Sequence, residues 1–533
     1  MDKKIIVLYG LFGLVTFNLW SAWKAAHPIV TPITTVATNQ LSHPPAVQVT
    51  AQTDQELVNI QTDVLHVSIN PTLGRIIQAD LLQYSASDYQ DKTPLRLLTT
   101  DINHPYYAAA EFVRMDDGQA QTIPFHYELT KKNYLLKEND QALDIVFKGT
   151  SNNGLILEKT YHFTPGSYVM EVLYHLKNTS DAPVKTYLNQ QITWTNPQIP
   201  EASMFQIGSY TGASFGQPGK HRYKKVSFDE MKKNKLDVDT KGGWIAMQQH
   251  YFLSAWVPNQ DSLNRLYTQQ VNAQFIIGSV SEPYVIEPHQ SLNLSSKLYV
   301  GPEDTAVLKT LAPGLDLTVD YGWLWFLSDA LFSLMKTLYH VLGNWGWSIV
   351  LITILIKLAF FRLSASSYRS MANMRKLQPK LEQLKQRFGD DKAKFSQATM
   401  ELYRQEKVNP LGGCLPIIVQ IPVFIALYWV LVESVELRHA PFIFWIKDLS
   451  ASDPLHILPL IMGLTMFIQQ KLNPTPPDPT QAKVMMLMPI FFTFLFWGFP
   501  AGLVLYWIVN NSLSIMQQWW ITRQYQDKVL VKS

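Results

Sequence analysis

The sequence predicts a polytopic α-helical membrane protein that carries one large β-rich domain outside the bilayer. Apolar residues cluster at the extreme N-terminus and again after Trp323, in runs long enough to cross a bilayer. The segment between these runs has mixed polarity, with short strands separated by turn signals. The chain has 533 residues, 47% of them hydrophobic, and a net charge of only +3, which excludes a disordered chain and a nucleic-acid binder.

No motif indicates a cofactor or a metal. The single cysteine, Cys414, lies within an apolar run, so the β-rich domain is expected to fold without disulfides. The sequence has no Cys-His cluster with metal spacing, no Walker loop and no dinucleotide fingerprint. We therefore expect neither a cofactor nor a metal site.

The first 53 residues predict a membrane anchor and a linker. Met1–Lys4 is basic and the following run is apolar, which fits either a cleavable signal peptide or an uncleaved anchor. The run is longer than a typical signal core, and Trp20 and Trp23 suit a membrane interface, so an anchor over residues 1–23 is favoured. Residues 24–53 are rich in Thr, Pro, Gln and Ala, which is typical of a flexible linker.

Residues 54–319 predict one large β-sandwich. Four of its expected strands are Leu65–Ile69, Leu155–Phe163, Tyr168–Leu176 and Asn293–Val300, separated by Gly-, Pro- and Asn-containing turns. The histidines and carboxylates are scattered without triad spacing and are most simply surface groups. A carbohydrate-type groove on this sandwich stays open, without residues that the sequence can assign to it.

Six apolar segments predict six transmembrane helices. They cover residues 1–23, 343–362, 411–435, 455–471, 483–499 and 502–520. From Arg362 to Lys407 the chain holds eleven Lys/Arg against five Asp/Glu, and from Glu436 to Asp453 two against three. The positive-inside rule therefore places residues 363–410 in the cytoplasm and 436–454 outside. The loop at 472–482, the tail at 521–533 and the N-terminus are then cytoplasmic.

An amphipathic helix over residues 320–342 precedes the second span. Asp329, Ser333, Lys336 and His340 form a polar stripe. The apolar residues assigned to the opposite face are Trp323, Phe326, Ala330, Leu334 and Leu338. This pattern predicts a helix that lies along the membrane surface.

The basic loop at 363–410 predicts a helical hairpin in the cytoplasm. Apolar residues repeat every three or four positions from Met371 to Phe388, Gly389 ends this helix, and Asp390 is the expected cap of the next one. Its charged face is either plain solvation or a docking surface for anionic lipid, a ribosome or a partner protein. The candidate docking residues are Arg369, Arg375, Lys376, Lys385 and Arg387.

Lys357 is the unusual residue of the second span. A cation in mid-helix costs about 2.5–3.5 kcal/mol on insertion scales, so it requires either a route to the interface or polar surroundings. Thr353 lies one turn before it, and Gln420 and Asn510 fall in the same leaflet. None of these is an acid, and Glu433 belongs near the outer end of its span. A hydrated inner-leaflet cavity is therefore favoured over simple snorkelling of the lysine.

Several long motifs resemble the bacterial YidC membrane-protein insertases. They are Leu315–Trp323, Ser370–Arg375, Asn409–Pro416, Val435–Arg438, Phe442–Asp448 with Asp453-Pro454, and Phe499–Tyr506. The resemblance covers essentially the whole chain. It implies an inner-membrane insertase and chaperone with a periplasmic β-supersandwich, a cytoplasmic helical hairpin and a five-helix core, in which a hydrophilic groove open to cytoplasm and lipid carries one positive charge.

The resemblance also implies roles for single residues. The position of the groove charge, usually arginine, is Lys357, which keeps the charge without the bidentate guanidinium fork. The expected polar groove residues are Lys357, Thr353, Gln420 and Asn510. The expected apolar path for the client contains Ile417, Ile421, Phe424, Phe491, Phe494 and Tyr506. Trp507 departs from the tyrosine that is common at that position.

The implied partners are nascent membrane proteins, the Sec translocon (SecYEG with SecDF), the ribosome or signal recognition pathway, and the lipid bilayer. No bond is made or broken, so no catalytic residue is expected. Two other classes stay open on the residues alone. One is a secondary transporter that uses Lys357, and the other is a membrane-anchored periplasmic ligand-binding protein.

Overall fold

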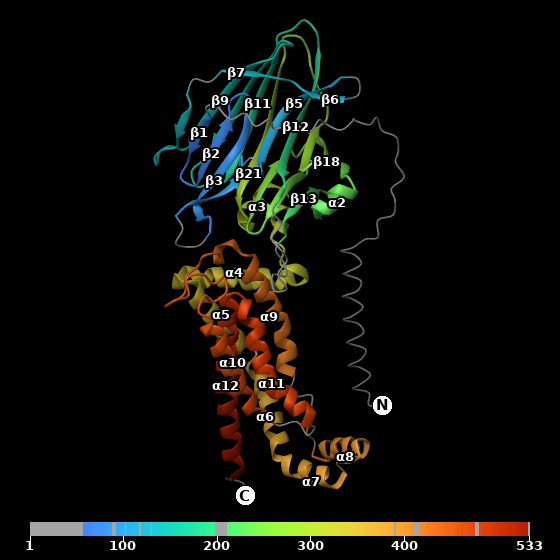
Figure 1. The fold of residues 1–533 in the computed structure, drawn as a ribbon, viewed down its shortest axis with the longest axis vertical. Coiled ribbons are helices and arrows are strands. Elements are labelled where there is room, and N and C mark those ends of the chain that lie inside the picture. The colour runs from blue at the N-terminus through green and yellow to red at the C-terminus, as the bar shows by residue number, and fades with distance from the viewer. Residues whose placement is uncertain are drawn as a thin grey trace.

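The structure is a computed structural model that describes residues 57–87, 92–101, 103–116, 119–128, 131–197, 210–388, 391–406, 408, 415–474 and 479–530. The predicted anchor at 1–23 and the linker at 24–53 lie outside the described residues. Figure 1 shows two parts, a β-rich part and a bundle of helices, with helix α4 lying crosswise between them.

The β-rich part consists of two sheets. The twelve-stranded sheet runs in the order β15-β18-β19-β12-β5-β3-β2-β1-β8, with β4, β6 and β20 paired at its sides. Its strands are β1 (Val58–Gln61), β2 (Leu65–Asn70), β3 (Arg75–Ser85), β4 (Pro94–Leu98), β5 (Tyr106–Asp116), β6 (Gln119–Thr122), β8 (Asn133–Leu135), β12 (Val184–Thr195), β15 (Asp237–Lys241), β18 (Leu263–Val271), β19 (Gln274–Ser281) and β20 (Tyr284–Ile286). Its registered pairs are antiparallel except for β1 with β8.

The nine-stranded sheet runs in the order β14-β13-β16-β17-β21-β11-β10-β9-β7. Its strands are β7 (His126–Glu128), β9 (Leu143–Thr150), β10 (Leu155–Phe163), β11 (Val169–Asn178), β13 (Gly212–Gln217), β14 (His221–Val226), β16 (Trp244–Gln249), β17 (Phe252–Val257) and β21 (Ser291–Pro302). The four strands that the sequence predicted are confirmed to within two residues at each end.

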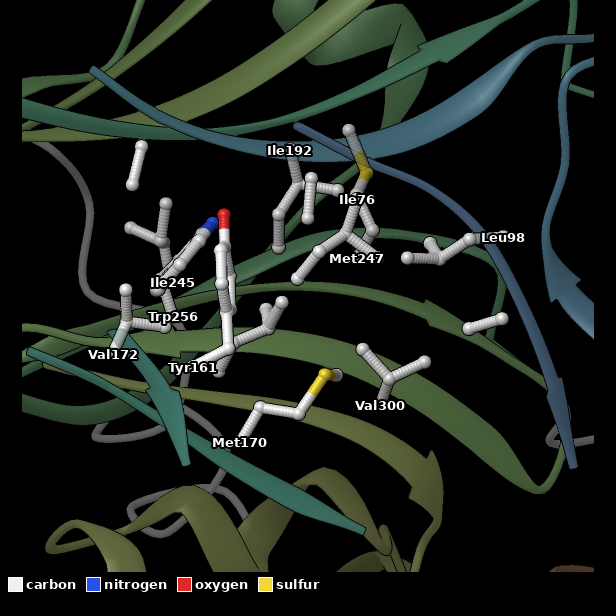
Figure 2. Close-up of a cluster of buried hydrophobic side chains, with 14 of the residues drawn as sticks. Ile76, Leu98, Tyr161, Met170, Val172, Ile192, Ile245, Met247, Trp256 and Val300 are labelled. Atoms are coloured by element: carbon white, nitrogen blue, oxygen red, sulfur yellow. The ribbon is translucent and has the colours of Figure 1, made fainter. Parts of the chain in front are cut away.

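The core of the β-rich part lies between the two sheets. Along β10 and β11 buried and exposed residues alternate, because successive side chains of a strand point to opposite faces. Figure 2 shows Ile76 and Ile192 from the larger sheet meeting Tyr161, Met170 and Val300 from the smaller one. The sequence periodicity therefore produces a two-sheet sandwich with one shared apolar core.

A lysine is buried within this core. Among the described residues, β3 and β5 are paired at one position, Ile76 with Ala108. The described ladder between the two strands does not continue beyond this pair. The Nζ atom of Lys159 donates to the carbonyl oxygens of Gly74 at 2.8 Å and Ala110 at 3.0 Å. Burial lowers the pKa of Lys159 to about 7. The ammonium of Lys159 thus connects the Gly74 and Ala110 carbonyl oxygens at the point where the pairing between β3 and β5 ends.

The helices follow the strands, apart from a short one inserted after β14. They are α2 (Phe228–Lys233), α3 (Thr305–Leu311), η1 (Leu315–Thr318), η2 (Gly322–Leu324), α4 (Trp325–Leu342), α5 (Trp345–Ala359), α6 (Phe361–Lys376), α7 (Gln378–Phe388), α8 (Lys392–Gln405), α9 (Leu415–Glu433), η4 (Val435–Leu437), α10 (Ile457–Leu472), α11 (Pro479–Leu495), η5 (Phe496–Gly498) and α12 (Ala501–Leu530). Helices α10 and α12 pack side by side, as do α5 and α12.

The second predicted span ends earlier than the sequence indicated. Helix α5 stops at Ala359, and after Phe360 the chain continues as α6 at an angle of 67°. In the part of the chain that the structure describes, no single helix has both the length and the hydropathy to span a bilayer, whereas α5 and α6 together pass that test. The number of spans stays a prediction.

Helix α4 has three faces, where the sequence suggested two. The polar stripe from Asp329 to His340 is largely exposed, with Lys336 paired to Glu436 at 2.6 Å. The face packed into the bundle consists of Ser328, Leu331, Phe332 and Met335. Exposed apolar residues, Phe326 and Leu334 among them, lie between these two faces, and the exposed Trp323 precedes the helix in η2. The assignment of these exposed residues to the face opposite the polar stripe was therefore wrong, because that face is buried against other helices.

The cytoplasmic hairpin predicted from the sequence corresponds to α6, α7 and α8. Leu377, Leu381 and Tyr403 form its small apolar cluster. The cap of α8 is Asp391, whose Oδ1 accepts from the backbone N–H of Lys394 at 3.0 Å, one residue later than predicted. Asp390 lies outside the described residues.

The β-rich part contacts the bundle through the turn between β16 and β17. The Nε2 atom of His250 in this turn lies 2.9 Å from the carbonyl oxygen of Val432, in the last turn of α9. That carbonyl has no partner within its own helix, so the imidazole N–H caps it. The guanidinium of Arg438 donates to the Ser85 carbonyl at 2.9 Å and adds a second connection.

Candidate functional site

A cavity of about 410 Å³ lies within the helical bundle. Helices α5, α6, α9, α10, α11 and α12 and the short η5 contribute to its walls. The lining residues are Lys357, Tyr368, Met371, Gln420, Ile421, Phe424, Met466, Gln469, Gln470, Asn473, Met485, Met488, Pro489, Phe492, Phe496, Tyr506, Trp507, Asn510, Asn511 and Ser514. The lining is therefore amphipathic, and Lys357 is the one charged side chain among these described residues. We call it the bundle cavity.

Lys357 lies in the last turn of α5. Its Nζ donates to the hydroxyl oxygen of Ser514 on α12 at 2.7 Å. A helix C-terminus favours a cation by about 0.3–1 kcal/mol, because the last carbonyls carry partial negative charge. The bend after Ala359 thus places the lysine at a helix end, where the sequence predicted mid-helix. This accounts in part for a semi-buried cation without an acid beside it.

Amide groups connect α9 and α12 beside the lysine. The Nε2 atom of Gln420 donates to the Tyr506 hydroxyl at 3.2 Å and to the Oδ1 atom of Asn510. The Ser514 hydroxyl in turn donates to the Asn510 carbonyl at 2.8 Å. These residues, with Lys357, form a continuous polar wall of neutral groups and one cation. The structure thus brings together three of the four predicted polar groove residues.

Thr353 is the fourth predicted groove residue, and it does not line the cavity. It is 1% exposed, and its hydroxyl donates to the Ile349 carbonyl of its own helix at 2.6 Å. Thr353 lies one turn before Lys357, as predicted. Its hydroxyl is hydrogen-bonded to the backbone of its own helix, as is common for threonine in helices.

The structure divides the residues predicted for the apolar path into two groups. Ile421, Phe424 and Tyr506 line the bundle cavity, whereas Phe491 and Phe494 are 59% and 70% exposed and lie outside its lining. The phenylalanines that face the cavity at this end of α11 and in η5 are Phe492 and Phe496. Helix α11 is apolar on all sides here, so periodicity could not select the inward face. The side chain of Ile417 lies outside the described residues.

Sequence reasoning missed a second group of lining residues. Tyr368 and Met371 come from α6, which was assigned to the cytoplasmic hairpin. Trp507 also lines the cavity, with its ring 5.2 Å from that of Phe424, and its Nε1 atom is buried without a hydrogen-bond partner among the described residues. The bend between α5 and α6 was the missing information, since it turns the start of α6 back against α12.

The basic residues predicted as a docking surface are spread over two helices. Arg369, Lys376, Lys385 and Arg387 are exposed on α6 and α7. Arg375 instead donates to the Lys471 carbonyl at the end of α10, at 3.1 Å. The exposed cations keep the docking hypothesis open, while Arg375 has a structural contact.

Within the residues that the structure describes, neither an acid nor a metal-type cluster is part of the bundle cavity. Among the described residues, no group of three or more His, Cys, Asp and Glu is placed to hold a metal ion. Glu433 is 5% exposed at the far end of α9 and is not among the lining residues of the bundle cavity. The cavity therefore offers one cation, several amide and hydroxyl groups, and an apolar surface.

Comparison with known proteins gives the family. Residues 57–334 match the family described as YidC periplasmic domain, and residues 337–528 match the family described as 60Kd inner membrane protein. The membrane protein insertase YidC of Legionella pneumophila (strain Corby) is 55% identical over 545 aligned positions, covering 99% of this chain and 98% of the relative. The insertase YidC of Coxiella burnetii (strain Dugway 5J108-111) is 42% identical, covering 99% and 97%.

A solved structure titled as an active YidC insertase with the first transmembrane domain resolved is 17% identical, covers 87% of this chain and 92% of that chain, and has a TM-score of 0.38. The two family matches and the two full-length relatives establish the family without this structure. The chain therefore belongs to the YidC membrane protein insertase family.

Proposed function

We propose that this protein is a membrane protein insertase and chaperone of the inner membrane, and that the bundle cavity is its client site. The observation that carries the proposal is a cation on an amphipathic cavity wall whose hydrogen-bond partner, Ser514, is neutral. Such a cation attracts acidic groups, and in a low dielectric this attraction is much stronger than in water. The full-length relatives that bear the name insertase support the same function.

In the proposed mechanism, the polar wall and the apolar lining residues of the bundle cavity bind different parts of one client. The polar tail of a nascent segment enters beside Lys357, Gln420 and Asn510, where hydration shortens the apolar distance that the tail must cross. The apolar part moves along Ile421 and Phe424 towards lipid. No covalent step occurs, so these residues bind and orient the client.

The proposed topology has both termini in the cytoplasm and the β-rich part in the periplasm. The proposed topology also includes six spans at the predicted positions, the surface helix at 320–342 and the cytoplasmic hairpin at 363–410. The exposed cations of α6 and α7 are the proposed contact for the ribosome or the signal recognition pathway. We propose that the protein inserts clients both alone and together with the Sec translocon (SecYEG with SecDF).

The two other function classes are less well supported. A transporter would use Lys357 as a coupling cation, and an anchored periplasmic protein would carry its function in the β-rich part. The names and coverage of the relatives favour the insertase over both.

The test is site-specific crosslinking to a ribosome-bound nascent chain. A photoreactive amino acid at Gln420 or Phe424 is expected to crosslink to a client stalled during insertion. Phe494 is the matched control, because it is a phenylalanine of the neighbouring helix α11 that lies outside the cavity lining. Crosslinks at Phe424 at least fivefold stronger than at Phe494 support the client site. Equal crosslinking at both positions, or none at Gln420 and Phe424, would overturn it.

A further inference from the structure

Methionine is over-represented in the bundle cavity. Four of the sixteen methionines of the chain line it: Met371 on α6, Met466 on α10, and Met485 and Met488 on α11. None of them lies on α5, α9 or α12, the helices that carry the polar wall. We refer to these four lining residues together as the methionine wall.

Methionine has properties that the other apolar lining residues lack. Its side chain is unbranched, has three rotatable bonds and ends near a polarisable sulfur, so it adapts to surfaces of different shape. Ile421 is β-branched and stiff, and Phe424, Phe492 and Phe496 are rigid rings. A cavity that served one ligand would gain more from rigid, preorganised contacts. The methionine wall is instead typical of a surface that binds partners of varied sequence.

The cavity size limits what the wall contacts at any moment. A volume of about 410 Å³ lies in the range of small-ligand pockets, and it accommodates a few side chains rather than a whole helix. Contact is thus made with successive apolar side chains of the client, which differ in bulk and branching. Each change of shape requires the wall to repack.

Given the proposed insertase function, on which this inference rests, we infer that the methionine wall sets the range of apolar segments that the protein accepts. Met371, Met466, Met485 and Met488 change rotamer to fit small, branched or aromatic client side chains. Lys357 recognises the polar tail, and the wall determines which apolar segments can accompany that tail.

The test compares two sets of substitutions in the full-length protein reconstituted in liposomes. One variant changes Met466, Met485 and Met488 to Ile, and the matched variant changes them to Leu. Insertion is measured for two single-span clients with the same acidic tail, one with a Leu/Ala-rich span and one with a Trp/Phe-rich span. The Ile variant is expected to lose about tenfold more insertion of the aromatic client than of the Leu/Ala client. The Leu variant is expected to keep both within threefold.

Two outcomes would overturn the inference: an equal loss of both clients in the Ile variant, or no loss of either. Failure of the proposed function has a different signature, because the wild-type protein would then insert neither client above the level of protein-free liposomes.

A second measurement covers the case in which the Ile variant does not fold. Mild peroxide converts exposed methionines to the polar sulfoxide. We expect peroxide to reduce insertion by the wild-type protein severalfold, and to reduce insertion by the Leu variant less than twofold. Equal sensitivity of both proteins would contradict a role of the wall in client binding.

Discussion

Lys159 and Lys357 are both lysines withdrawn from water, yet their surroundings differ. Lys159 is closed within the sandwich core, donates to two backbone carbonyls and lies near the Tyr161 ring, with Glu111 contributing favourable charge. Lys357 donates to the hydroxyl of Ser514 and borders an open cavity. The comparison teaches that burial of a cation does not by itself indicate function. A lysine whose partners fill its surroundings is structural, whereas one that faces unfilled space has bonding capacity left for a ligand.

The largest expected effect is on the closed lysine. K159A removes three methylene groups and the ammonium from the core and leaves the Ala110 carbonyl without its donor, so we expect the free energy of unfolding of the β-rich part to fall by about 3 kcal/mol. K159M keeps most of the volume but also leaves the Ala110 carbonyl without its donor, so it should lower the free energy of unfolding by a smaller amount, about 1–2 kcal/mol at pH 7. Guanidinium titration of the full-length protein in detergent measures both. A small effect of K159A would mean that the site collapses without cost.

The next effect is a dependence of stability on pH. The folded pKa of Lys159, about 7, lies below the unfolded value near 10.5, so between these values the unfolded state binds more protons. Stability of the wild-type β-rich part relative to K159M should therefore rise by about 2 kcal/mol from pH 7 to pH 9 and stay constant below pH 6. The same titrations at several pH values test this. Parallel pH profiles of the two proteins would show that Lys159 keeps its proton when folded.

Substitution of Lys357, which borders the open cavity, should affect insertion and leave stability largely unchanged. K357A is expected to reduce insertion of clients with acidic tails about tenfold, roughly 1.4 kcal/mol, while K357R keeps it within threefold because the charge is retained. Protease protection in proteoliposomes is the measurement, with a client of uncharged tail as control. An alanine variant that inserts acidic-tail clients as well as wild type would refute the role of the charge.

The smallest effect is expected for the hydroxyl that pairs with the open lysine. S514A removes the acceptor of Lys357 Nζ, but the cavity beside it can supply water, so insertion should stay within about twofold of wild type. A tenfold loss in S514A would mean that Lys357 is held in place as rigidly as Lys159, and the distinction between the two lysines would fail.

Much of the fold could be predicted from the sequence because it is periodic. Strands β10 and β11 alternate in polarity, and their limits follow from that alternation and the adjacent turns. The burial of Lys159 could not be predicted, because a lysine in an alternating strand has the same sequence pattern whether its partners are water or backbone carbonyls of a distant strand. The order of strands within the two sheets depends on long-range pairing, which periodicity does not encode.

The polar half of the candidate site was predicted more completely than its apolar half, of which Ile421 and Phe424 were predicted. Lys357, Gln420 and Asn510 stand out because polar side chains are rare in apolar segments. The apolar half was harder, since Phe491 and Phe492 are chemically identical and only the packing of α11 decides which faces the cavity. The bend after Ala359 was also invisible, because no proline or glycine marks it.

The contact between His250 and Val432 has a mechanical consequence. It joins the C-terminal end of α9 to the turn between β16 and β17, and the same helix carries Phe424 eight residues earlier in the chain, about 12 Å along its axis. A helix transmits displacement along its length with little compression. A displacement of the β-rich part would therefore be passed along α9 to the side of the bundle cavity that carries Phe424.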